Sequence, residues 1–200
     1  VSMVEQALDG HLFRSALYGY ESLQVLPDVQ IVGGLSYESL RFPENFLSAP
    51  MSSRQKHVAQ ISPKAGFIWT PNDATTLRFA FSRSLGGFDV DQSLQIEPSQ
   101  IAGFVQTYRS LIPETVTGGN SGERMQTLGV SLEKKFESQS YVGVLGEILS
   151  SEASRTLGAF EIDPTLELYA RPSAVRQDFD YSERSIAATF DQLLGSEWIV

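Results

Sequence analysis

Cysteine, basic charge and long apolar runs are missing or scarce in this 200-residue chain, and each absence removes a class of protein. Without cysteine there can be no disulfide scaffold, cysteine-based zinc site or thiol catalysis. Lysine and arginine number 15 against 24 aspartates and glutamates, and a net charge of −9 argues against nucleic-acid binding through bulk electrostatics. No apolar run approaches the roughly 18 residues of a membrane-spanning helix.

What the chain does contain is a hydrophobic period of two. Apolar residues alternate with polar or small ones over many segments, for example at Leu77, Phe79 and Phe81 and at Leu128, Val130 and Leu132. Alternation of this kind places each set on one face of a strand. The pattern predicts eight strands, near residues 11–22, 28–38, 57–70, 75–85, 122–137, 139–153, 174–192 and 196–200.

The connections between these strands alternate in length. Four are short: 23–27, 71–74, 137–138 and 193–195. Three are long: 39–56, 86–121 and 154–173. In an antiparallel meander, this order collects the short turns at one end, as in outer-membrane barrels. We therefore expect an all-β, antiparallel up-and-down meander that forms a transmembrane β-barrel or a slice of one.

Two further patterns favour a barrel in lipid. Aromatic residues lie beside each short turn, as in the girdle of a barrel at a lipid–water interface; they are Tyr20, Phe67, Trp69, Phe136, Tyr141, Phe190 and Trp198. Apolar residues of the central strands should face outward, namely Phe67, Trp69, Leu77, Phe79, Phe81, Leu128, Val130 and Leu132. Polar residues should face inward, namely Arg78, Ser82, Thr127, Ser131 and Glu133.

The hairpin at residues 61–84, with its Ser-Pro-Lys start, Pro-Asn-Asp turn and Thr-Leu-Arg strand, resembles the barrel hairpins of TonB-dependent outer-membrane receptors. The loop 111–116 and the strand 127–136 extend the resemblance over residues 58–137. It implies a periplasmic turn at 71–74, a small solute as ligand, and a plug domain or energy-coupling protein as partner. Neither the plug nor its coupling box occurs in these 200 residues, so residues 1–200 are expected to be a single barrel segment from inside a longer chain.

No group of residues predicts catalysis, a cofactor or a bound metal. His11 and His57 lack the spacing of a metal pair, and 89–93 has only the first oxygen ligands of a calcium loop. The long connection at 86–121 is the expected recognition loop, with Phe88, Phe104, Tyr108 and Arg109 as candidate solute contacts. Ile101, Phe104, Val105, Tyr108 and Leu111 recur at helical spacing, which predicts a helix in this loop.

The sequence thus predicts a non-enzymatic barrel segment in the outer membrane of a Gram-negative bacterium, in contact with lipid and serving solute uptake or passage. Two alternatives keep the membrane setting: a porin-like barrel, and a barrel linked to periplasmic repeats. A third is of another class, a soluble lipocalin-like barrel that binds a ligand. It would carry its large apolar residues inside the barrel, whereas a membrane barrel carries them outside.

Overall fold

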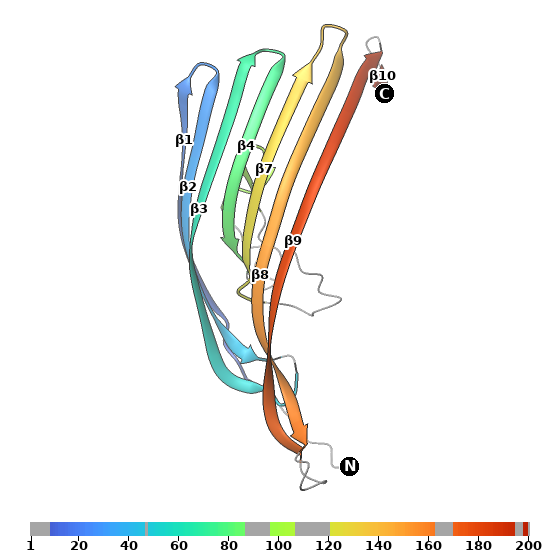
Figure 1. Ribbon diagram of the computed structural model, residues 1–200. Coiled ribbons are helices and arrows are strands. Elements are labelled where there is room, and N and C mark those ends of the chain that lie inside the picture. Colours follow the sequence, from blue (N-terminus) through green and yellow to red (C-terminus); the bar gives the residue numbers. More distant parts are fainter. Residues whose placement is uncertain are drawn as a thin grey trace.

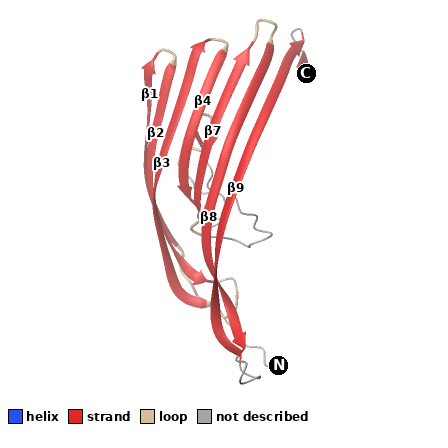
Figure 2. Ribbon diagram, viewed as in Figure 1, coloured by secondary structure: helices blue, strands red, loops and turns tan. Residues whose placement is uncertain are grey.

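The computed structural model describes residues 9–46, 48–86, 97–106, 121–162, 170–194 and 198–199. Within these ranges all regular structure is β-strand, which confirms the predicted all-β class (Figure 2). No helix in the described part of the chain is long and apolar enough to cross a membrane.

Eight strands form one antiparallel sheet in which the strands follow one another in sequence order (Figure 1). They are β1 (Phe13–Leu26), β2 (Val29–Asn45), β3 (Ser52–Asn72), β4 (Thr75–Leu85), β7 (Arg124–Lys135), β8 (Ser140–Ile162), β9 (Ala170–Leu194) and β10 (Trp198–Ile199). Two short strands, β5 (Gln100–Ile101) and β6 (Phe104–Val105), form a separate hairpin. The up-and-down meander predicted from the connections is therefore confirmed.

The short turns gather at one end of the sheet, the upper end in Figure 1. Turns occupy 27–28, 73–74 and 137–138. At the second turn, Asn72 Oδ1 accepts a hydrogen bond from the backbone N–H of Ala74 at 3.0 Å, the usual way an Asx side chain closes a tight turn. Two of the three residues of the fourth predicted turn, Leu193 and Leu194, belong to β9, and residue 195 lies outside the described residues.

Two of the three long connections are shorter than predicted. β2 and β3 continue through much of 39–56, and β8 and β9 continue through much of 154–173. In these extensions the backbone ladder persists, for example from Arg41↔His57 to Pro43↔Gln55. On β2 the apolar residues Leu40 and Phe42 face inward there, and on β8 polar and apolar residues mix on both faces, so the pattern of the neighbouring segment is interrupted although the strand does not end.

The sheet curves toward one of its faces. Lys56 on β3 and Ser154 on β8 are separated in the sheet by β4 and β7, yet Lys56 Nζ donates to the Ser154 carbonyl oxygen at 2.7 Å. Thr156 on β8 likewise donates to Glu44 on β2 at 3.2 Å. We call the concave face, which carries Lys56, the inner face and the opposite one the outer face. In the part of the chain that the structure describes, β1 does not pair with β9 or β10, so the sheet stays open.

The β5–β6 hairpin lies on the inner face, behind β4 and β7 in Figure 1, and buries Ile101, Ala102 and Phe104 against Ala80. The predicted helix over Ile101–Leu111 is therefore wrong for its described part. Ile101 and Phe104 are cross-strand partners about the Ala102–Gly103 turn. A spacing of three residues places two side chains on one side of a two-residue hairpin as well as on one face of a helix.

Candidate functional site: the inner face and its hairpin

The two faces of the sheet carry opposite kinds of side chain. Strand register places the predicted outward and inward residues on opposite faces, since Phe79 pairs with Val130 and Arg78 with Ser131. Buried polar residues line the inner face: Ser36, Glu38, Gln60, Ser62, Lys64, Ser82, Ser84, Thr127, Ser131 and Ser151. Large apolar residues stand exposed on the outer face: Leu17, Ile31, Leu35, Ile61, Phe79, Val130, Leu132, Val144, Ile148, Ile186 and Phe190.

The exposed apolar residues form a band with definite limits. From Val29 to Ser39, from Ala59 to Trp69 and from Val142 to Ser150, no outward-facing position carries a charge. Each stretch is about 9 to 11 residues long, the length of a tilted membrane-spanning strand. Toward the long loops the next outward positions are Arg41, His57 and Glu152. On β2, β3 and β8 the band therefore begins at the short turns and ends at ionisable groups, whereas on the flanking strands β1 and β9 the outward Glu21 and Arg184 lie opposite Gly33 and Ile148.

Aromatic side chains at the turn-side limit of this band combine apolar exposure with a polar contact. The Trp69 ring is 39% exposed on the outer face, and its Nε1–H donates to Asp28 Oδ2 in the first turn at 3.0 Å. Phe136 and Phe190 are exposed near the same end. Tyr20 and Tyr141 do not belong with them, which corrects their predicted place in the girdle: Tyr20 lies on the inner face across from Gly34, and Tyr141 lies on the inward register between Lys135 and Asp191. The Trp198 side chain lies outside the described residues.

A buried carboxylate organises the first four strands on the inner face. Glu38 on β2 is fully buried and forms an ion pair with Arg14 on β1 at 2.6 Å. Its other oxygen accepts hydrogen bonds from the Leu85 backbone N–H of β4 at 3.1 Å and from the Ser62 hydroxyl of β3 at 3.5 Å. Such a carboxylate is stable when buried only because cation and donors satisfy both oxygens.

Glycines make room for the hairpin on this surface. A Cβ built at Gly129 on β7 would lie 2.3 Å from the Phe104 ring, and one built at Gly66 on β3 would lie 2.8 Å from Ile101 and 2.9 Å from Ala102. Real Cβ atoms do not approach so closely, so a side chain at either glycine would force the hairpin or its neighbours to shift. Gly34 receives the Tyr20 ring in the same way. Glycines on neighbouring strands thus form a flat seat for the hairpin.

The hairpin turn itself is unusual. Ala102 and Gly103 both have positive φ, 50° and 91°, as a two-residue type I′ turn requires. Glycine or asparagine is the usual choice at the first position, and alanine there costs on the order of 1 kcal/mol or more. The Ala102 methyl group is buried over Gly66, a contact that glycine could not provide.

Polar side chains fix one side of the hairpin to the sheet. Glu97, which precedes β5, accepts a hydrogen bond from the Tyr20 hydroxyl at 2.9 Å and pairs with Lys64 Nζ at 3.5 Å. Gln106, which follows β6, donates to the Tyr20 oxygen at 3.3 Å and to the Pro98 carbonyl at 2.7 Å. The Lys64 side chain is fully buried, with its ammonium 5.8 Å from the centre of the Tyr20 ring. We call Tyr20, Lys64, Glu97 and Gln106 the anchor cluster.

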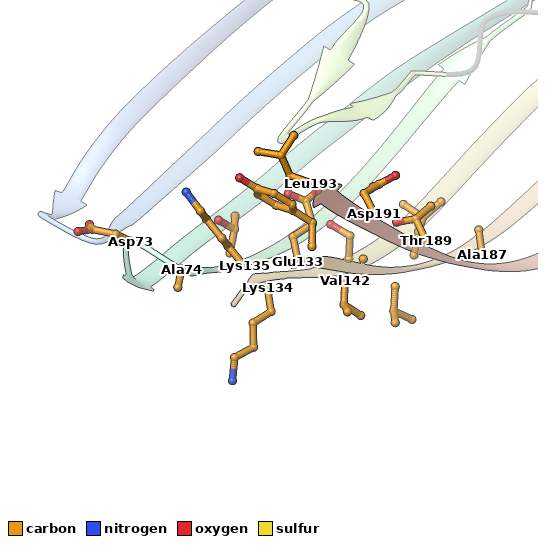
Figure 3. A pocket seen from close by; sticks show the side chains of 16 residues that line it. Asp73, Ala74, Glu133, Lys134, Lys135, Val142, Ala187, Thr189, Asp191 and Leu193 are labelled. Atoms are coloured by element: carbon orange, nitrogen blue, oxygen red, sulfur yellow. The ribbon is translucent and has the colours of Figure 1, made fainter. Parts of the chain in front are cut away.

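Nearer the short turns, an open groove of about 800 Å³ lies along β7, β8 and β9 (Figure 3). Its polar lining includes Glu133, Lys135, Thr189 and Asp191. Figure 3 shows Lys135 and Asp191 on one side of the strands and Lys134 pointing to the other, as alternation requires. Glu133 is paired with Arg78. The groove thus offers both signs of charge and several hydroxyl groups to a polar solute.

Of the four solute contacts predicted from the sequence, only Phe104 lies among the described residues. Phe88, Tyr108 and Arg109 lie outside the described residues. Phe104 is 5% exposed beneath the hairpin, where it packs on Gly129 and attaches the hairpin to the sheet.

The acidic residues of β9, Asp178, Asp180 and Glu183, do not form one site. Asp178 pairs with Arg176, while Glu183 accepts a hydrogen bond from Tyr181 on the opposite face. Ser39 and His57 share a hydrogen bond at 2.8 Å on the outer face.

The anchor cluster was missed at the sequence level because its members are far apart in the chain. Tyr20 and Glu97 are 77 residues apart, and no local pattern links them. One signal was available: Gly66, Ala80 and Gly129 fall on inward positions of three successive strands. A patch of such small residues marks a place where another part of the chain can approach closely.

Comparison with known proteins adds no identification, because no family model, curated protein or solved structure matches this chain. The resemblance of residues 58–137 to receptor barrels therefore stays a prediction.

Proposed function

We propose that this chain forms part of the wall of an outer-membrane β-barrel in a Gram-negative bacterium, and that the barrel serves the passage or uptake of a small solute. The observation that carries the proposal is that the sheet exposes apolar residues on its outer face and buries polar residues on its inner face, the reverse of a water-soluble protein. Its outer face exposes Val130, Ile148 and Ile186, while its inner face buries Glu38, Ser62 and Thr127. Lipid in contact with the outer face would remove this apolar surface from water, which is favourable by roughly 25 cal/mol per Å².

Three further features support a membrane setting. The uncharged outer stretches match the length of tilted membrane strands. Short turns and long loops lie at opposite ends, as in barrels whose short turns face the periplasm. Trp69 has an exposed ring and a hydrogen-bonded N–H at the limit of the band, which suits a lipid–water interface.

The inner face supports a role in solute passage. Its buried wall residues are mostly polar, and Val32, Ile68 and Leu145 form an apolar patch only where they pack on the hairpin. The groove near the short turns presents carboxylates, an ammonium and hydroxyl groups. Polar lumens of this kind let hydrated solutes through a membrane. A soluble lipocalin-like module would need large apolar side chains on the inner face, and the buried Ser36, Ser62 and Lys64 argue against it.

Single cysteines test the lipid contact, because the chain contains none of its own. We would introduce them one at a time at Val130 and Ser131, attach a nitroxide spin label, and refold the protein into phospholipid vesicles. Collision with oxygen, which concentrates in lipid, should dominate at Val130, and collision with a water-soluble nickel chelate should dominate at Ser131. Glu152, on the same face beyond the band, is the matched control and should favour nickel. Equal nickel access at Val130 and Ser131 would refute the proposal.

A further inference from the structure

Building on the proposed function, we propose that the β5–β6 hairpin is the constriction of the passage, and that the anchor cluster holds it across the inner face. The hairpin belongs to the connection between β4 and β7, which leaves the sheet at the loop end. Its described residues fold back onto the inner face instead of extending away from it. Whatever crosses the barrel along this face must pass the hairpin.

The way the hairpin is attached distinguishes it from the wall. It forms its own two-stranded sheet and adds no strand to the eight. Side chains join it to the wall: Ile101, Ala102 and Phe104 fill the space over Gly66, Ala80 and Gly129. Side-chain contacts of this kind can be weakened without breaking any backbone hydrogen bond between the wall strands. Substitutions can therefore change the hairpin without changing the wall.

The anchor cluster fixes the hairpin at the side nearest β1. Glu97 is 7% exposed and contacts two elements at once, the Tyr20 hydroxyl of β1 and the Lys64 ammonium of β3. A buried ion pair contributes little by itself, but removal of one partner leaves the other charge buried and poorly compensated. Substitution of Glu97 should therefore displace the chain around it and allow Lys64 to seek water.

The geometry also supplies a means of holding the hairpin in place. The Cβ position of Gly66 lies 2.9 Å from the Ala102 Cβ. Disulfides join Cβ atoms about 3.8 Å apart, so cysteines at both positions need a shift of only about 1 Å. The closest other atom is the Ile101 Cγ2 methyl group at 2.8 Å, which rotation about χ1 would move away. The pair Gly66→Cys/Ala102→Cys thus locks the hairpin reversibly.

The experiment uses potassium chloride conductance in planar bilayers and swelling of proteoliposomes in arabinose, a small neutral sugar. Glu97→Ala should raise conductance about twofold or more, because conduction follows the width of the narrowest segment. Adding the Gly66/Ala102 cysteine pair to Glu97→Ala should return conductance to the wild-type level when oxidised and release it again with reductant. Arabinose entry should follow the same order.

Other outcomes are equally decisive. A rise in Glu97→Ala that the oxidised disulfide does not reverse would show that the hairpin is not the constriction. If Glu97→Ala has no effect, the double variant Glu97→Ala/Phe104→Ala removes the apolar anchor as well, and unchanged conductance there overturns the inference. Both results leave the proposed function intact as long as the labels at Val130 and Ser131 report lipid and water. Failure of those labels refutes the proposed function itself.

Discussion

Strands β2 and β3 pair along almost their whole length, yet their two halves carry different side chains. In the turn-side half, from Val29 to Ser39 and from Ala59 to Trp69, outward positions lack charge, and the charged residues Glu38 and Lys64 face inward. In the loop-side half, Arg41 and His57 face outward, and Phe42 is buried on the inner side next to the Lys56 ammonium. Backbone pairing is the same in both halves.

The difference indicates that the environment on each side of a strand, and not the strand conformation itself, determines the alternation of apolar and polar residues. A strand between an apolar and a wet environment must alternate, because each misplaced side chain costs the transfer free energy. Beyond the proposed lipid contact this constraint does not apply, and on β2 the apolar Phe42 is buried on the inner side while Arg41 is exposed on the outer side. Charges there pair across strands and along them, as Arg176 does with Asp178.

The largest expected effect tests where the apolar band ends, by placing a charge inside it and at its limit. Val130→Arg puts a charge at the centre of the apolar band and should cost about 2 to 4 kcal/mol if lipid covers it. Ser182→Arg on β9, an exposed outward position opposite Ser150 at the loop-side limit of the band and next to the outward Arg184, should change stability by less than about 0.5 kcal/mol. Urea unfolding of both variants from phospholipid vesicles measures the difference. A loss below about 0.5 kcal/mol for Val130→Arg would contradict a lipid contact at this site.

The second prediction compares the two faces within the band. Gly129→Ala points a methyl group at the Phe104 ring and should destabilise the protein by about 1 to 3 kcal/mol through overpacking, or displace the hairpin. Gly146→Ala on the neighbouring strand β8 has only Val130 Cγ1 at 3.7 Å and the Ser185 carbonyl at 4.0 Å nearby. It should be neutral or stabilise by about 0.4 to 1 kcal/mol, because alanine restricts the unfolded chain. The same urea titration tests both, and equal losses would show that Gly129 has no special role.

The contrast between the halves also explains how much of the fold the sequence can predict. Fold class, strand order and sidedness are visible in the alternation at residues such as Leu77, Phe79 and Val130, because the apolar band dictates these positions. Strand ends are poorly predicted where apolar residues no longer keep to the outer face, as with the inward Leu40 and Phe42 in the extension at 39–45 and the mixed residues at 154–162.

The β5–β6 hairpin could not be predicted from the sequence for a different reason. Ile101 and Phe104 satisfy the spacing of a helix and of a two-residue hairpin alike, and local residues cannot decide between them. What decides is the flat surface over Gly66 and Gly129, on strands far away in the chain. Tyr20 and Lys64 are ordinary strand residues until the hairpin brings Glu97 to them.

The smallest expected effect concerns the loop-side half, whose charges remain in contact with water. Lys56 bridges the curved sheet by donating to the Ser154 carbonyl and hydroxyl oxygens at 2.7 and 2.8 Å. Burial lowers the pKa of Lys56 below the ordinary value of 10.5, and the nearby Arg176 lowers it further, against the opposing pull of Glu44 and Asp178. The unfolded chain therefore binds more protons than the folded one between the lowered pKa and 10.5.

In that window stability should rise with pH, because the cost of keeping the folded ammonium charged disappears as it deprotonates. Both Ser154 oxygens remain available to the neutral amine, so the bridge itself can persist. Lys56→Met removes the titrating amine but keeps a long, unbranched side chain. Comparison of the wild-type protein with this variant cancels the titration of all other residues. We expect the urea midpoint of the wild-type protein to gain slightly on that of Lys56→Met from neutral pH to 10.5. Midpoints that run parallel over this range would mean that Lys56 is as well solvated in the fold as in the unfolded chain.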